Sequence, residues 1–172
     1  MARALRYKCI GYGVMVLIFY VLQSAAASPL RVMGQTPYFM LLLTLAVSFR
    51  ESETFSAFFG LICGFLADAV TGSTVGIRAV FYMFLGFFLA IALQTLFRPL
   101  FLSYVLVTLG ALAASVILEY LFFILLSGQI PFTYALVHTM LPQIFLSGVW
   151  SYVIYYIVYR YNLSLKRRGI LS

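Results

Sequence analysis

The ionisable side chains inside long apolar stretches are the residues of this sequence that could do chemistry. Asp68, Glu119 and His138 stand within such stretches, and Arg78 opens another. Carboxylates and a histidine can act as general acids and bases, as metal ligands or as the base beside a nucleophile. Here they stand on three separate stretches, with no accompanying nucleophile or ligand motif. The sequence therefore argues against an intramembrane enzyme, and it predicts no catalytic residue, metal site or cofactor.

The composition identifies the solvent of the chain. Of its 172 residues 65% are hydrophobic and only 9% are charged, and the mean hydropathy is +1.08. A soluble domain carries about 25% charged residues. In lipid the backbone must satisfy its hydrogen bonds internally, and apolar runs of about 17 to 25 residues indicate helices rather than barrel strands. We therefore predict an all-α polytopic membrane protein.

The apolar runs divide the chain into six predicted transmembrane helices within a single domain, residues 1–172. The expected spans are 9–27, 37–49, 55–70, 77–97, 100–126 and 132–159. Thr36 and Pro37 suit the N-cap and first position of the second span. At about 13 residues, near 20 Å, this span is short for a hydrocarbon core of about 30 Å.

The basic residues predict the orientation of the chain. Of the 11 lysines and arginines, only Arg31 and Arg78 fall on the side opposite the two termini. The positive-inside rule therefore places both termini in the cytoplasm. Topology and anionic lipid headgroups also account for the net charge of +7, so no nucleic-acid partner is expected. The N-terminal stretch also has the features of a cleavable signal peptide, an alternative that the residues leave open.

This topology brings the four intramembrane polar residues to the outer half of the bundle. We expect Asp68 to meet Arg78 across the loop "TGST", and Glu119 to face His138. Charged residues within membrane spans are costly, so they are usually paired or functional. The pairs either fix the register of the helices or form a switch that senses a partner.

Small residues and a carboxylate recur at every fourth position between Gly60 and Gly76. On a helix, Gly60 and Gly64 share one face and let another backbone approach closely. That backbone can belong to the chain itself, to a partner, or to a second copy in a homodimer. After Asp68, Gly72 and Gly76 permit the backbone angles of a turn.

The stretch "GLICGFLADAVTGSTVGIRAVFYMFLGFF" resembles the signature of the MreD family, the rod shape-determining membrane proteins of bacteria. The matching positions are Gly60, Gly64, Asp68, Gly72, Ser73, Thr74, Gly76 and Arg78. Pro37 before a short second span, "FRPL" at residues 97–100, the six-span plan and the length agree with the family as well. The resemblance assigns no role to Glu119 or His138.

This resemblance implies a non-enzymatic subunit of the bacterial elongation machinery in the cytoplasmic (inner) membrane. Family members bind the single-span protein MreC. They belong to a complex with the actin-like MreB, the glycosyltransferase RodA and a class B penicillin-binding protein, which inserts peptidoglycan along the side wall. The family fold is similar to the substrate-binding subunits of energy-coupling-factor transporters, an analogy that does not transfer vitamin binding.

A small-molecule uptake subunit of the vitamin type is the alternative function. A high-affinity pocket normally collects several convergent polar groups. The fifth and sixth spans offer only Glu119, His138, Gln143 and scattered hydroxyls. A membrane scaffold that binds a partner is therefore the preferred interpretation.

Overall fold

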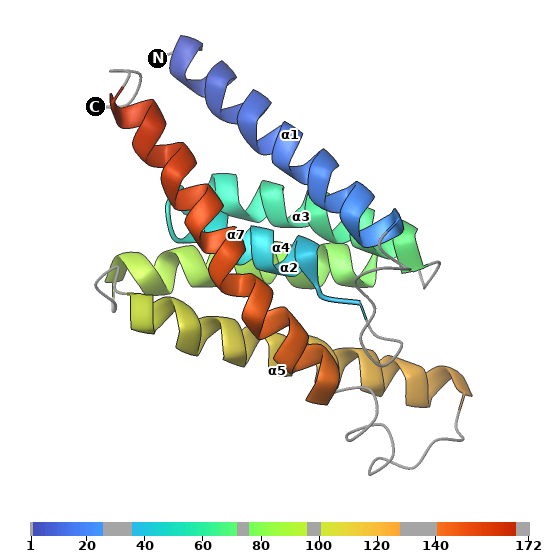
Figure 1. Ribbon diagram of the computed structural model, residues 1–172. Coiled ribbons are helices and arrows are strands. Elements are labelled where there is room, and N and C mark those ends of the chain that lie inside the picture. Colours follow the sequence, from blue (N-terminus) through green and yellow to red (C-terminus); the bar gives the residue numbers. More distant parts are fainter. Residues whose placement is uncertain (1, 26–35, 72–75, 96–100, 128–140, 168–172) are drawn as a thin grey trace.

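The computed structural model describes residues 2–25, 36–71, 76–95, 101–127 and 141–167 (Figure 1). Six α-helices lie within these residues. They are α1 (Ala2–Ala25), α2 (Phe39–Ser48), α3 (Glu53–Thr71), α4 (Ile77–Thr95), α5 (Phe101–Ser127) and α7 (Leu141–Arg167). The all-helical prediction is thus confirmed for the described part of the chain.

The helix bounds follow the predicted spans closely in the middle of the chain and differ at its two ends. The first helix already begins at Ala2, and the last continues to Arg167, past the expected end at residue 159. Both extensions carry basic residues, which are good helix formers and do not end a helix where it leaves the apolar layer. Residues 132–140 of the sixth predicted span lie outside the described residues.

Among the described residues, three helices are long and apolar enough to cross a membrane. The qualifying stretches are Glu53–Val70, Tyr104–Leu121 and Leu141–Leu165. The other three helices contribute shorter apolar stretches, namely Lys8–Ser24, Phe39–Ser48 and Ile77–Ala92. The six-span topology and the cytoplasmic placement of the termini stay predictions.

The short helix α2 forms the centre of the bundle. It has ten residues, and each is between 0% and 2% exposed. It contacts α1, α3, α4, α5 and α7, which enclose it as Figure 1 shows. A helix that is apolar on all sides is expected to be buried, and α2 meets this expectation. The helix within the second predicted span is therefore short, as expected, and it is completely buried.

Among the described helices, α3 and α4 form the most closely packed pair. A Cβ atom at Gly60 would lie 2.3 Å from the carbonyl oxygen of Tyr82, and one at Gly64 would lie 2.4 Å from that of Arg78. These distances leave no room for a side chain, so the backbones touch. The face formed by Gly60 and Gly64 is therefore occupied by a helix of the same chain, and it is not available to a partner or a second copy.

The beginning of α1 and the end of α7 lie together at one end of the bundle (Figure 1). The rings of Tyr12 and Tyr161 are 5.7 Å apart, edge to face. A Cβ atom at Gly11 would collide with the Tyr161 ring, so the glycine makes room for it. This contact brings the two terminal helices to the end of the bundle where α2 stops and α3 starts.

Candidate functional site

The first turn of α4 is organised around the carboxylate of Asp68, which lies near the end of α3. Gly76 has a φ of +107°, a left-handed conformation that favours glycine, and Ile77 then begins the helix. The Gly76 N–H donates to Asp68 Oδ2 over 2.9 Å, and the Ala79 N–H donates to the same atom over 3.4 Å. An anion at a helix N-terminus satisfies orphan N–H groups and complements the helix dipole. Asp68 therefore caps α4 from a position that is only 2% exposed.

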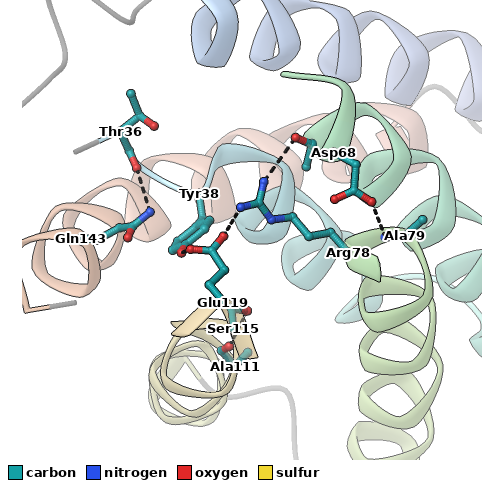
Figure 2. A network of polar contacts seen from close by, with 10 residues as sticks. Thr36, Tyr38, Asp68, Arg78, Ala79, Ala111, Ser115, Glu119 and Gln143 are labelled. Carbon is teal, nitrogen blue, oxygen red and sulfur yellow. Dashed lines mark hydrogen bonds and ion pairs between the residues drawn. The ribbon is translucent and has the colours of Figure 1, made fainter. Parts of the chain in front are cut away.

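Arg78 extends from this first turn to join α4 with α3 and α5. Its Nη1 donates to the carbonyl of Ala67 over 3.4 Å, and its Nη2 forms an ion pair with Oε1 of Glu119 (Figure 2). The side chains of Arg78 and Glu119 are 15% and 27% exposed, respectively. The ion pair is therefore mostly buried, and it links α4 to α5 across the interior of the bundle.

Tyr38, which immediately precedes α2, completes this arrangement. Its hydroxyl donates to Oε2 of Glu119, so both carboxylate oxygens of Glu119 are engaged. Its backbone N–H donates to Oγ of Ser147 on α7 over 3.1 Å. We refer to Tyr38, Asp68, Arg78 and Glu119 as the polar layer. With Ser147, it connects the start of α2 to α3, α4, α5 and α7.

A second set of polar contacts lies at the opposite end of α2. Lys8 Nζ donates to Oε2 of Glu51 over 2.7 Å, and the Tyr12 hydroxyl donates to Oε1 over 2.9 Å. Asn162 Nδ2 donates to the Tyr12 hydroxyl over 2.8 Å. We refer to Lys8, Tyr12, Glu51 and Asn162 as the terminal cluster. It joins α1, the turn between α2 and α3, and the end of α7.

The structure brings three of the four predicted polar residues together, namely Asp68, Arg78 and Glu119. The described partners of Glu119 are Arg78 and Tyr38, whereas we expected it to face His138, which lies outside the described residues. Asp68 and Arg78 lie beside each other in Figure 2, and Asp68 accepts from the backbone N–H groups of Gly76 and Ala79, the second of which Figure 2 draws. The direct ion pair between Asp68 and Arg78 stays a prediction.

Of the family signature, the structure describes Gly60, Gly64, Asp68, Gly76 and Arg78. The remaining positions, Gly72, Ser73 and Thr74, lie outside the described residues. Sequence reasoning did not single out Tyr38. Its position directly after Pro37, at the start of the short second predicted span, was the available signal. Sequence reasoning also missed the terminal cluster, for which the four-residue spacing of Lys8 and Tyr12 on one helix face was the available signal.

Comparison with known protein families identifies the family of this chain. Residues 7–164 match the family described as the rod shape-determining protein MreD. The chain belongs to the MreD family. No curated protein and no solved structure matches it. Membership assigns the chain a role in rod shape determination, and MreD is a family of structural membrane proteins rather than a known enzyme family.

The MreD match includes the polar layer and the terminal cluster, so both lie in the family region of the chain. Within the described ranges, no group of three or more His, Cys, Asp or Glu side chains is placed to hold a metal ion. What the described charged groups do is join helices: Asp68 caps α4, Arg78 reaches α5, and Lys8 ties α1 to the turn before α3. The likeness to the energy-coupling-factor fold stays a prediction.

Proposed function

We propose that this MreD-family protein is a non-enzymatic membrane scaffold of the bacterial elongation complex, in the cytoplasmic membrane. In this proposal it binds MreC directly and supports the side-wall peptidoglycan synthesis that shapes a rod. MreB, RodA and the class B penicillin-binding protein are the further members of the same complex. The observation that carries the proposal is the family match over residues 7–164.

The way the bundle is held together supports a scaffold rather than a site of turnover. Both ends of the buried helix α2 are fixed by polar contacts, through Tyr38 at one end and Glu51 at the other. Buried hydrogen bonds and ion pairs between helices favour one arrangement of those helices over others. A partner would therefore meet a surface of fixed shape.

The uptake alternative gains no support from the polar side chains that it would use. Glu119 is bound to Arg78 and Tyr38, and Gln143 Nε2 donates to the carbonyl of Thr36 over 3.5 Å (Figure 2). These groups serve the contacts between helices, whereas a ligand site needs polar groups directed at the ligand.

The test is genetic replacement combined with co-purification. In a cell from which the gene is deleted, re-expression of the wild-type protein is expected to restore rod shape, measured as cell width, and to retain MreC on purification. Rod shape without retained MreC would remove direct MreC binding from the proposal. Round cells despite wild-type membrane levels would overturn the role in the elongation complex.

The surface that meets MreC is best mapped by crosslinking from exposed positions. Single cysteines on α3 and α4 are suitable because the side chains there are between 49% and 66% exposed; the positions are Phe58, Phe65, Phe84 and Phe88. The exposed native Cys9 is first replaced by serine. The Cys9→Ser protein that retains only the native Cys63 is the matched negative control, since this side chain is 0% exposed. Crosslinks to MreC from one helix only would identify the docking side.

A further inference from the structure

Arg50 is held on the surface at the end of α2 by two tyrosines of α7. Its Nη2 donates to the hydroxyl of Tyr155 over 3.1 Å. Its guanidinium carbon lies 4.8 Å from the ring centroid of Tyr159 and 5.8 Å from that of Tyr155. The residue is nevertheless exposed. The planar cation is therefore oriented by its neighbours while it remains accessible from outside.

The adjacent face of α7 continues this surface. Arg160 lies 5.8 Å from the ring centroid of Tyr156, one turn earlier on the helix. Tyr156, Tyr159, Arg160 and Arg167 are exposed. We refer to these four residues with Arg50 as the basic tyrosine face.

Glu51, the carboxylate next to Arg50 in the sequence, already has other partners. Glu51 bonds to Lys8 and Tyr12, and its side chain is only 8% exposed. The positive charge of Arg50 is therefore not cancelled by the residue beside it. Guanidinium groups match the geometry of phosphate oxygens, and tyrosines favour the headgroup level of a bilayer.

We propose that the basic tyrosine face binds the phosphate headgroups of anionic phospholipids in the leaflet at this end of the bundle. A topology signal requires positive charge alone, which lysine supplies as well as arginine. Arg50 has in addition a fixed plane, set by the Tyr155 hydroxyl and the Tyr159 ring, from which further N–H groups can reach a phosphate. The face thus has the geometry of a site. The inference is independent of MreC binding.

Native mass spectrometry of the purified full chain tests this inference. The protein is titrated with phosphatidylglycerol and, separately, with phosphatidylcholine of identical acyl chains. The wild type is expected to bind the anionic lipid in preference. Arg50→Gln is expected to reduce that preference about fivefold, the equivalent of about 1 kcal/mol for one basic residue near an anionic surface. Arg50→Lys keeps the charge and is expected to lose about half of the preference, because stacking and fork geometry are lost.

Three further variants separate a site from general charge. Arg3→Gln removes the same charge from the first turn of α1 and is expected to leave the lipid preference unchanged. Tyr159→Phe keeps the ring under Arg50 and is expected to behave as the wild type, whereas Tyr159→Leu is expected to resemble Arg50→Lys. Thermal unfolding of each variant in detergent identifies any that fail to fold.

Several outcomes would overturn the inference. These are equal binding of the two lipids by the wild type, wild-type preference in Arg50→Lys, and an equal loss in Arg3→Gln and Arg50→Gln. Displacement of phosphatidylglycerol by excess free glycerol 3-phosphate would show a site for a soluble phosphate instead of a lipid surface.

Discussion

Replacing Gly64 with alanine is expected to force α3 and α4 apart. The new Cβ atom would lie 2.4 Å from the carbonyl oxygen of Arg78 and 2.5 Å from the Cα atom of Ala79. Carbon atoms in contact prefer separations of about 3.5 to 4.0 Å, so the helices must separate by roughly 1 Å. Both obstacles are backbone atoms, which cannot rotate away as a side chain can.

The size of the effect follows from two opposing contributions. Overpacking costs about 1–3 kcal/mol, and rigid obstacles place this site at the upper end. Alanine regains about 1 kcal/mol because it is a better helix former than glycine. The expected net loss in the free energy of unfolding is therefore about 2 kcal/mol. Gly60→Ala is expected to behave alike, since its Cβ would lie 2.3 Å from the Tyr82 carbonyl oxygen.

Two other glycines provide controls, because alanine at these positions is expected to raise the free energy of unfolding rather than lower it. Around Gly13 on α1 and Gly110 on α5, no described atom lies within 4 Å of an added Cβ. Alanine at either position keeps only the gain in helix propensity, about 0.5–1 kcal/mol. The structure therefore predicts that the same chemical change destabilises at one pair of positions and stabilises at the other.

Unfolding in mixed micelles with a denaturing detergent provides the measurement. The chain has a single tryptophan, Trp150, whose ring lies 5.3 Å from that of Phe39 on the buried helix α2. Its fluorescence therefore reports separation of α7 from the core. Equal stability of Gly64→Ala and Gly110→Ala would refute the close backbone contact between α3 and α4.

The polar contacts give further predictions in the same unfolding assay. Arg78→Glu or Glu119→Arg is expected to cost about 1–3 kcal/mol, because the pair is mostly buried, and the double exchange should recover part of the loss; no recovery would argue against the pair. Asp68→Asn, which keeps an acceptor oxygen without the charge, should cost about 0.5–1 kcal/mol, and Asp68→Ala about 1–2 kcal/mol. Equal losses in the two variants would contradict capping through the acceptor oxygen. Lys8→Met should destabilise by about 1–3 kcal/mol by stranding the Glu51 carboxylate, and Glu51→Gln added to it should restore part; additive losses would contradict the pairing.

The helices could be predicted from the sequence because long apolar runs and the breaks between them are local properties. The ranges 55–70 and 77–97 differ from α3 and α4 by two residues or fewer at each end. The glycine spacing likewise predicted a close backbone approach at Gly60 and Gly64. It could not say whose backbone approaches, because that depends on which helices are neighbours.

The same limit explains the partner of Arg78. The expected pair of Asp68 and Arg78 follows from their closeness in the sequence, whereas Glu119 lies 41 positions from Arg78 and meets it only through the packing of the helices, which the sequence does not give. Glu51 is a similar case. In a polar turn, a carboxylate is expected to face water, but the folding of α1 and α7 over the turn buries it with Lys8 and Tyr12.

The brevity of α2 has a consequence for how the protein enters the bilayer. Ten residues rise about 15 Å, half of a hydrocarbon core of about 30 Å, and insertion machinery selects single segments of about 20 apolar residues. As a single segment, α2 is therefore expected to be inserted poorly by the translocon. We expect α2 to enter together with α3 as one hairpin, around which the later helices close, and biogenesis would then depend on the order in which the neighbours of α2 arrive.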